Sequence, residues 1–500
     1  MPISNSNVYT GKEAKDRLIA GVNCVADAVK TTLGARGSNA ILQEEVYPFH
    51  IITNDGISIA QKVQMLHPVE QIGANIMKEV ADRANKESGD GTTTAITLTQ
   101  AILKAGNEEG SHRMEVKRSL DACMPIIEKS IDAQKRVITV DEVAAVATVS
   151  AEDPALGQML QEIYQAIGKD GIVELDNSGS FTTSWNLIEG VRLRNATYIS
   201  PYMATEGTKA VYKNPHILIT KQRIATLADI DPLFQELSSK GINELVMFVD
   251  DIDPTVVQAL AFTHSRGIFK TLIIKAPVLW KDWLYADFAA ITGATIVEPA
   301  SGVTLKDVRV SHLGTCDKIV TNKEETIVVG IKDISEHIKK LEEDPSEETQ
   351  LRLAWLKTKA AVLKLGASSE SELSYKRLKA EDARNAAYLA LQDGVVPGGG
   401  VALYNAALEL PETIGGKILR EALMAPFWQI VTNAGLEPDQ LTYTHDIGGN
   451  YGFDANTGSI VDMWEAKIVD PARVTKNSVR NAISIAGTVL TAETITVIPK

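Results

Sequence analysis

The sequence has few cysteines and histidines, and each shortage excludes a class of site. The three cysteines in 500 residues, Cys24, Cys123 and Cys316, are too far apart for a disulfide framework or a Cys-x-x-Cys metal site. The eight histidines form neither an HxxH nor an HExxH pattern, so a zinc site is not expected. Cys24 and Cys123 fall in helical apolar patterns, which predicts buried thiols. This usage indicates a reducing compartment, and we expect a cytoplasmic protein.

Long apolar runs and an excess of basic charge are also missing. No run approaches the roughly 18–20 apolar residues of a membrane helix, and the opening MPISNSNVYTGKEAKDRL lacks the apolar core of a secretion signal. Acidic residues number 64 against 50 basic ones, which gives a net charge of −14. General nucleic-acid binding needs basic patches. We therefore expect neither a membrane nor a nucleic acid as a partner.

What is present indicates a soluble globular protein of several domains. The hydrophobic share is 44% and the charged share 23%, and 500 residues exceed one ordinary core, so two to four domains are expected. Strand-like and helix-like segments alternate between about 217 and 297, which predicts a parallel α/β unit. The strands are expected at Ile217–Thr220, Leu245–Asp250, Thr271–Lys275 and Thr295–Val297, with helices near 231–239, 254–266 and 281–292.

The flanking parts have mainly helical periodicity. One short segment differs, because Asn54-Asp55-Gly56 between two β-branched runs predicts a hairpin turn. The expected helices are Lys12–Leu33, Val69–Asn85, Met114–Gln134, Glu336–Lys364 (interrupted by Asp344-Pro345) and Ser371–Gln392.

A glycine-rich loop, Gly89-Asp90-Gly91, joins two of these helical segments, and Thr92–Thr94 open the second one. Backbone N–H groups at such a helix start point at an anion, and the helix dipole favours negative charge there. A lone carboxylate beside it can hold a divalent cation that neutralises phosphates. On spacing alone, however, an ordinary capped helix after a glycine loop is the better explanation.

A second glycine-rich loop, Gly394–Gly400, also opens a helix. Phosphoryl transfer uses backbone amides, a metal and a carboxylate that orients water. The sequence has no GxxxxGK[ST], GxGxxG or GxSxG motif, so other nucleotide and hydrolase sites have no support. Turn aspartates are ordinary capping groups, and spacing alone does not say which of them meet. The candidate carboxylates are Asp55, Asp90, Asp382, Asp454 and Asp470.

Six stretches in a fixed order resemble the group I chaperonins, the bacterial GroEL type. The pairing of GDGTTT with a distant GGG is highly specific, and the similarity is weaker in the middle third. The stretches are TTLGARGSNAIL (31–42), ITNDGISIA (52–60), GANIMKEVADRANKESGDGTTTA (73–95), EDARNAAYLALQDGVVPGGGVAL (381–403), GNYGFDANTG (449–458) and VDPARVTKNSVRNAISIAGTVLTAE (469–493).

This resemblance implies a multi-domain α+β protein with three domains. A mainly α-helical equatorial ATP-binding domain would comprise residues 1–136 and 394–500. A small α/β intermediate hinge domain would comprise 137–190 and 359–393. An α/β apical polypeptide-binding domain, 191–358, would be inserted in the middle of the chain.

The resemblance also implies the residues of an ATP site. Asp90 would bind Mg²⁺, and Asp382, with Asp55 beside it, would orient or activate the attacking water. The carbonyl groups of Thr32 and Asn54, together with Thr93, resemble a K⁺ site. The further nucleotide-binding residues would be Leu33, Gly34, Ala35, Gly91, Thr92, Thr94, Gly398, Gly399, Gly400, Asp454, Ala455, Asn456 and Asp470.

Some positions depart from the family pattern. Ala35 and Asn54 stand where proline and lysine are usual, and Asp454 replaces an asparagine near the adenine. A carboxylate only accepts hydrogen bonds, so contacts to the base could differ. Asp231 stands where an apolar contact residue is usual, which weakens co-chaperonin docking.

The implied apical patch would bind non-native polypeptides. The alternative is that several of its residues are core, because helix-phased apolar residues usually are. Its residues are Tyr198, Tyr202, Met203, Leu233, Phe234, Val257, Ala261 and Phe262.

The sequence thus predicts an ATP-driven homo-oligomeric chaperonin built of seven-membered rings, with a co-chaperonin as a doubtful partner. Its ATPase cycle would drive the folding of non-native polypeptides in a cavity. One alternative is an ATP-binding ring that acts as an assembly scaffold for specific partners. A metabolic kinase is a third alternative, but the sequence offers no acceptor pocket for it.

Overall fold

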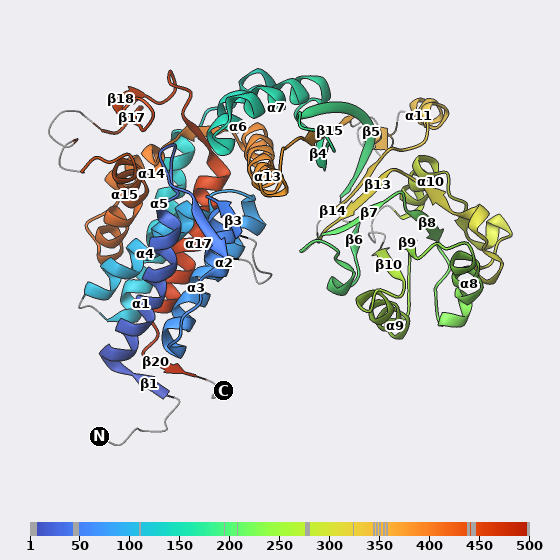
Figure 1. The fold of residues 1–500 in the computed structure, drawn as a ribbon, viewed down its shortest axis with the longest axis horizontal. Coiled ribbons are helices and arrows are strands. Elements are labelled where there is room, and N and C mark those ends of the chain that lie inside the picture. Colours follow the sequence, from blue (N-terminus) through green and yellow to red (C-terminus); the bar gives the residue numbers. More distant parts are fainter. Residues whose placement is uncertain are drawn as a thin grey trace. The chain divides into compact units, whose positions relative to one another are not determined.

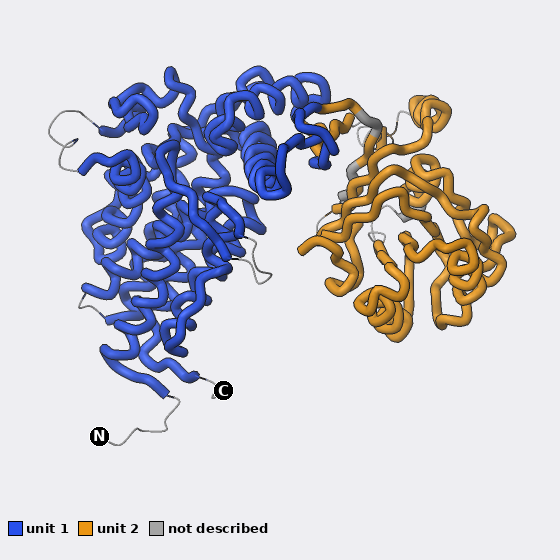
Figure 2. The backbone as a smooth tube through the Cα atoms, viewed as in Figure 1, with its two compact units in different colours: residues 1–169, 175–184, 364–500 blue, residues 170–174, 185–363 orange. Residues whose placement is uncertain are grey.

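The chain forms two compact units (Figures 1 and 2). In this computed structural model the described residues are 8–43, 50–109, 112–194, 196–207, 209–275, 281–323, 325–343, 346, 349, 352–353, 356, 359–437, 441 and 447–497. The first unit contains Met1–Lys169, Leu175–Ser184 and Lys364–Lys500, and the second contains Asp170–Glu174 and Trp185–Leu363. The second unit is therefore an insertion in the middle of the chain. The finer division into three domains stays a prediction.

Long amphipathic helices form the core of the first unit. Helix α1 (Gly11–Lys30) buries Leu18, Val22, Val25 and Val29, which recur every three or four residues along one face. This face packs against α3, and α17 packs against α3, α4 and α5, so the two ends of the chain build one core. The other helices of this core are α3 (Pro68–Ser88), α4 (Thr92–Glu108), α5 (Arg113–Ala133), α14 (Val401–Leu408), α15 (Ile414–Asn433) and α17 (Ala472–Leu490).

The cysteines lie only partly where the sequence predicts. Cys123 is buried in the core, but Cys24 is exposed. Cys24 precedes Val25 on α1 and lies off the stripe of apolar residues that faces α3, so the prediction of a buried thiol is wrong at this position.

Three further helices of the first unit pack on one another. Helix α6 (Val143–Ala151) packs against α7 (Pro154–Ile167) and α13 (Glu370–Asp393). Helix α7 begins where the Asp153 carboxylate accepts hydrogen bonds from backbone N–H groups of the first turn. Helix α13 confirms the helix predicted at Ser371–Gln392 and also contacts α17.

Short antiparallel ribbons close the first unit. The chain ends pair as β1 (Val8–Thr10) with β20 (Thr494–Thr496). The other pairs are β2 (Ala40–Gln43) with β3 (His50–Thr53), β16 (Val395–Pro397) with β19 (Val469–Pro471), and β17 (Tyr451–Asp454) with β18 (Ser459–Asp462).

The hairpin predicted at Asn54-Asp55-Gly56 is not formed. Strand β3 is followed by helix α2 (Gly56–Lys62), and Asp55 is the residue before it. Its carboxylate accepts a hydrogen bond from the Ser58 N–H group, 2.9 Å away, and so caps the helix. The sequence Asn54-Asp55-Gly56 is compatible with a hairpin turn and with a helix start, and the hydrogen bond to Asp55 stabilises the helix start.

A mostly parallel sheet lies in the second unit and confirms the predicted α/β alternation. Its order is β11-β8-β9-β10-β6, with β12 paired to β8. Helix α9 packs against β10, and α10 packs against β8, β11 and β12. The strands are β6 (Thr197–Tyr198), β8 (His216–Thr220), β9 (Glu244–Val249), β10 (Lys270–Lys275), β11 (Ile296–Val297) and β12 (Gly314–Thr315), and the helices are α8 (Asp231–Ser239), α9 (Pro254–Ser265) and α10 (Lys281–Thr292).

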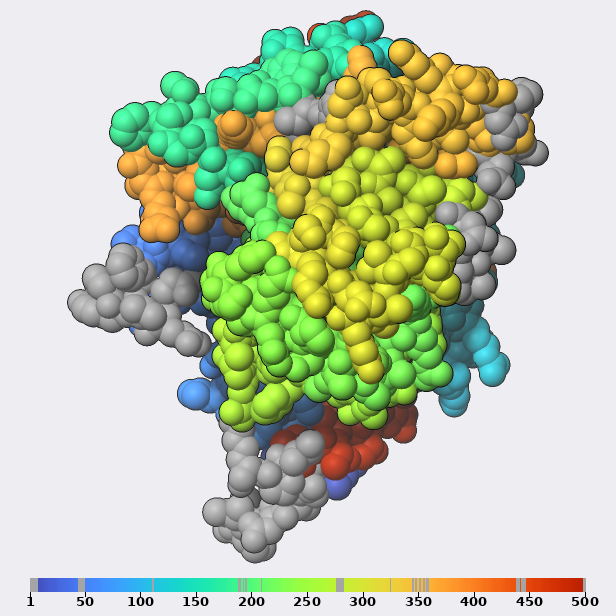
Figure 3. Space-filling model, turned by 90° about the vertical axis from the view of Figure 1, so that its right-hand side faces the viewer, coloured from blue at the N-terminus to red at the C-terminus, as the bar shows by residue number. Residues whose placement is uncertain are grey.

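A second sheet has the order β4-β15-β5-β14-β13-β7. Figure 3 shows one face of the second unit, coloured green to yellow. The strands of this sheet are β4 (Ile172–Asn177), β5 (Ser184–Arg194), β7 (Ala210–Lys213), β13 (Lys318–Thr321), β14 (Glu325–Val329) and β15 (Lys359–Leu365). Short 3-10 helices occur at Val140–Glu142, Pro201–Met203 (η2), Leu227–Asp229 (η3), Pro299–Ser301, Leu305–Asp307 and Val310–His312.

The helical prediction for Glu336–Lys364, with its interruption at Asp344-Pro345, is wrong at the end of the stretch. Helix α11 (Ser335–Glu342) begins this stretch, but its last residues form strand β15. Ala360, Ala361 and Leu363 of β15 are buried. Burial in a sheet therefore overrides the helical propensity of this Ala-, Leu- and Lys-rich segment.

Candidate functional site

A cavity of about 1050 Å³ lies within the first unit, where loops from both ends of the chain and from α13 meet. The chain brings together nearly all the residues that the sequence predicts for a nucleotide site. Gly398 is the exception, since Pro397 and Gly399 line the cavity and Gly398 does not. The predicted residues that line it are Thr32, Leu33, Gly34, Ala35, Asn54, Asp55, Asp90, Gly91, Thr92, Thr93, Thr94, Asp382, Gly399, Gly400, Asp454, Ala455, Asn456 and Asp470.

The loop between α3 and α4 contains two glycines in the left-handed backbone conformation that glycine adopts most readily. Gly89 ends α3 with φ 62° and Gly91 precedes α4 with φ 80°, both in the left-handed region. A Cβ atom on Gly91 would lie 2.6 Å from the Val474 side chain, so even a residue that tolerated this φ would clash. The free N–H groups of the first turn of α4 therefore begin at the cavity wall, which suits an anion.

Asp90 lies in this loop, half-buried. Its Oδ1 accepts a hydrogen bond from the Gly91 N–H group, and its Oδ2 accepts one from the Ser150 hydroxyl, 3.0 Å away. Burial raises the pKa of Asp90, while the hydrogen bonds from Gly91 and Ser150 and the charge of Lys379 oppose that rise. The carboxylate is thus held in place by two donors.

Three of the other acidic side chains that line the cavity, Asp55, Asp382 and Asp470, interact with the charge of Asp90. Burial, and then the charges of Asp90 and Asp55, raise the pKa of Asp382 well above its usual range. Burial and the charge of Asp90 raise the pKa of Asp470 to about 7, against a hydrogen bond from the Gly399 N–H group. The charges of Asp55, Asp90, Asp382 and Asp470 repel one another, and a divalent cation would relieve this repulsion. Among the described residues, however, no three Asp, Glu, His or Cys side chains are grouped so that they could hold a metal ion by themselves. A cation such as Mg²⁺ at Asp90 would therefore take most of its ligands from phosphate oxygens and water.

Asn54 adds an unsatisfied oxygen to the same wall. Its side chain is 8% exposed, and its Oδ1 atom has no hydrogen-bond partner among the described residues. Its Nδ2 atom donates to the Glu152 carboxylate, at 3.0 Å from Oε2. A buried acceptor without a donor is rare in native proteins and is compatible with a cation nearby.

Glu152 and Lys379 line the cavity, and sequence reasoning missed both. Lys379 donates to Oε1 of Glu152 at 3.0 Å. A signal for Lys379 existed, because it precedes Asp382 by three residues in a predicted helix and so shares its face. No sequence signal pointed to Glu152.

The second glycine loop borders the cavity as predicted, before a helix. Gly399 and Gly400 line the wall, and Gly400 immediately precedes α14. Strand β16, which leads into this loop, pairs with β19, and β19 contains Asp470. This pairing brings the glycine loop next to that carboxylate.

The β17–β18 turn forms another part of the wall, and Asp454 holds it together. Its carboxylate accepts hydrogen bonds from the Asn456 N–H group and the Thr457 hydroxyl, each at 2.9 Å. Arg36 donates to the Asn456 carbonyl oxygen at 3.2 Å. Asp454 therefore lines the cavity but is engaged by its own turn, which explains why aspartate serves there.

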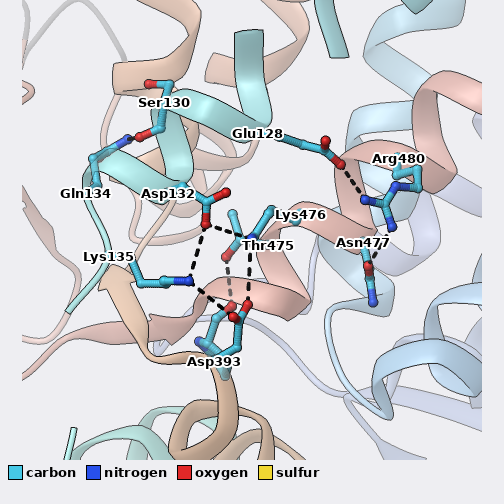
Figure 4. A network of polar contacts seen from close by, with 11 residues as sticks. Glu128, Ser130, Asp132, Gln134, Lys135, Asp393, Thr475, Lys476, Asn477 and Arg480 are labelled. Carbon is cyan, nitrogen blue, oxygen red and sulfur yellow. Dashed lines mark hydrogen bonds and ion pairs between the residues drawn. The ribbon is translucent and has the colours of Figure 1, made fainter. Parts of the chain in front are cut away.

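A network of four charged residues joins three helix ends (Figure 4). Lys135 lies 3.2 Å from Asp393 and 3.4 Å from Asp132, and Lys476 lies 2.8 Å from Asp132 and 3.6 Å from Asp393. The two lysines alternate with the two aspartates, so each cation contacts both anions. The network connects the C-terminal ends of α5 and α13 with the first turns of α17.

The two chain segments that follow this network are also paired. Arg136 and Val395 exchange two backbone hydrogen bonds of 2.8 Å. The Arg136 guanidinium group stacks on the Trp464 ring, 3.9 Å from its centroid. The predicted borders at 136 and 394, far apart in sequence, thus lie side by side.

The predicted polypeptide-binding residues lie in the second unit and differ widely in exposure. Tyr198, Met203, Leu233 and Ala261 are buried in its core, and Phe234 and Val257 are partly buried. Tyr202 is 74% exposed and Phe262 is 56% exposed. On α8 the outward side chains are polar, with Gln235 donating to Asp231 at 2.6 Å. The exposed apolar surface of this set is therefore carried by η2 and α9.

No helix among the described residues is both long enough and apolar enough to span a membrane.

Comparison with solved structures shows the fold. The chaperonin gp146 from the bacteriophage EL 2 (Pseudomonas aeruginosa), crystallised in the presence of ATP-BeFx, is 18% identical in sequence. In crystal form II it aligns with a TM-score of 0.71 over 99% of both chains. In crystal form I the TM-score is 0.66 over 99% of this chain and 100% of gp146. The α+β architecture is thus that of a chaperonin subunit.

Comparison of the sequence with protein families agrees with the fold. The TCP-1/cpn60 chaperonin family matches residues 25–499, which is nearly the whole chain. This chain therefore belongs to the TCP-1/cpn60 chaperonin family.

Proposed function

We propose that this protein is an ATP-hydrolysing chaperonin of the group I, GroEL type, and that hydrolysis drives the folding of non-native polypeptides. The single observation that supports this most is the cavity of the first unit. Two glycine-rich helix starts and the carboxylates Asp55, Asp90, Asp382 and Asp470 converge on it from both ends of the chain. None of these motifs alone requires the others to lie nearby, so their meeting at one cavity supports a shared nucleotide site.

The nucleotide would lie with its phosphates at the start of α4. Thr92, Thr93 and Thr94 line the cavity there, and their backbone N–H groups would bind phosphate oxygens. Mg²⁺ would be held by Asp90, and K⁺ by Thr32, Asn54 and Thr93. When bound, Mg²⁺ would neutralise charge on the phosphates and on the leaving group.

Asp382 would act on the attacking water. As the water oxygen attacks the terminal phosphorus, the bond to the bridging oxygen of the diphosphate breaks, and the water proton passes to the Asp382 carboxylate. Burial raises the pKa of Asp382, which brings its basicity closer to what a general base needs. Asp55 would assist by orienting the water. The products would be ADP and inorganic phosphate.

Hydrolysis would be coupled to motion through α13, which carries Asp382. Helix α13 packs against α6, and its last residue, Asp393, belongs to the ion-pair network. A catalytic group on a hinged segment completes the site only when the segment closes. Residues 137–190 and 359–393 would form this hinge domain, between an equatorial domain (1–136 and 394–500) and an apical domain (191–358).

Non-native polypeptides would bind the apolar surface of the second unit at Tyr202 and Phe262, with Phe234 and Val257 beside them. Exposed apolar patches are typical of interaction sites. The active assembly would be a homo-oligomer of seven-membered rings in the cytoplasm. A co-chaperonin is the less supported partner, because Asp231 makes the outward face of α8 polar.

The second candidate is an assembly scaffold, a ring that binds particular partners without folding them. The burial of Tyr198, Met203, Leu233 and Ala261 favours it, since the apolar surface left is small. A refolding experiment separates the two functions. A denatured test enzyme is diluted into buffer with the protein, with and without ATP. A chaperonin raises the yield in an ATP-dependent way, whereas a scaffold hydrolyses ATP and leaves the yield unchanged.

A further inference from the structure

Lys379 is a buried cation on the cavity wall to which the proposed mechanism assigns no task. Lys379 is 9% exposed, and it lines the same cavity as Asp90 and Asp382. It precedes Asp382 by three residues on α13, so the two side chains share one face of the helix. A lysine is almost never this buried unless it is paired.

The partner of Lys379 is Glu152, which follows the last residue of α6. The Lys379 Nζ atom lies 3.0 Å from Glu152 Oε1. Asn54 donates to both oxygens of the same carboxylate, at 3.3 and 3.0 Å. Glu152 therefore keeps two hydrogen bonds from Asn54 when Lys379 moves away.

The backbone at Glu152 supports a functional constraint. Its φ is 56°, in the left-handed region that non-glycine residues rarely adopt. Such strain persists where surrounding contacts enforce it, and it clusters at functional sites. Here the strained residue directly follows α6, and its carboxylate accepts the hydrogen bond from Lys379.

The charge of Lys379 reaches the carboxylates of the site. It opposes the rise in pKa of both Asp90 and Asp382. Another cation of the wall, Arg136, stacks on Trp464 instead. A lysine is a point charge on a flexible stem, so it can exchange one anion for another within reach.

We propose that Lys379 is a specificity-determining residue that recognises the terminal phosphate of a nucleoside triphosphate. Without nucleotide its ammonium group pairs with Glu152. When a triphosphate enters, the ammonium group leaves Glu152 and pairs with the terminal phosphate, which a diphosphate lacks. This inference rests on the nucleotide site proposed above, and it involves no covalent step.

The test compares the affinities for a non-hydrolysable ATP analogue and for ADP, each with Mg²⁺. In Lys379→Met we expect the triphosphate analogue to bind about 10- to 100-fold more weakly, the range for a hydrogen bond to a charged group. ADP affinity should stay within about twofold, since ADP lacks the phosphate concerned. Lys379→Arg keeps the charge and should restore most of the triphosphate affinity.

Two outcomes with Lys379→Met overturn the proposal. One is an equal loss of affinity for both nucleotides in Lys379→Met, which a merely structural role would produce, and the other is no loss for either.

Glu152→Gln removes the competing charge and keeps the side-chain shape, so it should bind the triphosphate analogue at least as tightly as the wild type. If Lys379→Met fails to fold, Glu152→Gln still decides, because weaker triphosphate binding there contradicts the proposal. A wild-type protein that binds neither nucleotide would contradict the nucleotide site itself.

Discussion

The Ser150 hydroxyl donates a hydrogen bond to the Oδ2 atom of Asp90, 3.0 Å away. Ser150 lies in α6 and Asp90 in the loop that starts α4, so this contact joins a helix of the predicted hinge to the predicted metal ligand. A ligand that takes Oδ2 of Asp90 competes with Ser150. If nucleotide binds as proposed, this contact would couple its binding directly to α6.

Ser150→Ala should loosen α6 in the protein without nucleotide. The loss of one hydrogen bond amounts to about 1 kcal/mol, so amide exchange across Val143–Ala151 should become about fivefold faster. Hydrogen exchange read by mass spectrometry measures this directly. Ser239→Ala is the control, because that hydroxyl donates to the Glu236 carbonyl oxygen within its own helix, α8. Unchanged exchange in α6 would show that the contact does not hold the helix.

Asp470→Asn should stabilise the protein more at high pH than at low pH. Because the pKa of Asp470 is raised to about 7 from 3.8, the folded chain keeps a proton there that the unfolded chain releases above about pH 4. Stability therefore falls as pH rises from about 4 to about 7. Asparagine removes this loss and can still accept the Gly399 N–H group.

The measurement for Asp470→Asn is the free energy of urea unfolding at pH 5 and pH 8. The gain over the wild type should be at least about 1 kcal/mol larger at pH 8. Asp16→Asn, an exposed change on α1, should give no such difference. A gain that is equal at both pH values would contradict the buried, proton-retaining carboxylate.

Asp393→Asn should weaken the junction between α5, α13 and α17 in a salt-dependent way. It removes one of the two anions that Lys135 and Lys476 share, and all three side chains are partly exposed. The expected loss is about 1 kcal/mol of unfolding free energy at low salt, and less in 1 M NaCl, where charges are screened.

Urea unfolding at two salt concentrations tests this loss. Glu79→Gln breaks an exposed pair with Arg83 on α3 and serves as the matched control, with an expected loss below about 0.5 kcal/mol. An identical loss for Asp393→Asn at both salt concentrations would show that the network does not act through charge.

The double variant Tyr202→Ser, Phe262→Ser should lose capture of non-native chains and keep its fold. Both side chains are exposed, so removing them takes away a binding surface and leaves the core intact. We expect at least a threefold drop in the suppression of aggregation of a denatured test protein. Leu227→Ser, at an exposed position in η3 of the same unit, is the control. Equal capture by the double variant would favour the scaffold function.

Much of the fold was predictable because local periodicity determined it. The strands around Leu245 and Thr271 alternate with helices in the sequence and in the structure. The prediction failed where tertiary burial decided, as at Ala360 and Ala361, which lie in a strand despite high helical propensity. The hairpin prediction at Asp55 failed for another reason, because the same turn residues are typical both of a hairpin and of a helix cap.

The candidate site was predictable residue by residue but not in its connections. Resemblance indicated Asp90 and Asp382, yet nothing in the sequence linked Lys379 to Glu152, which lies 227 positions away. Such pairs depend on the packing of α6 against α13, and sequence spacing carries no record of it. The sequence did not determine which predicted apical residues are exposed for the same reason. A leucine in phase with a helix, such as Leu233, can lie either in the core or on the surface.

The most direct test of the central claim is the turnover of ATP by Asp382→Ala. If Asp382 accepts the proton of the attacking water, the variant should still bind ATP with near-normal affinity while steady-state hydrolysis falls about 100-fold or more. ATP binding is measured by calorimetry and ATP hydrolysis by phosphate release, with folded wild-type protein and folded Asp382→Ala. Near-normal turnover in Asp382→Ala would contradict the account.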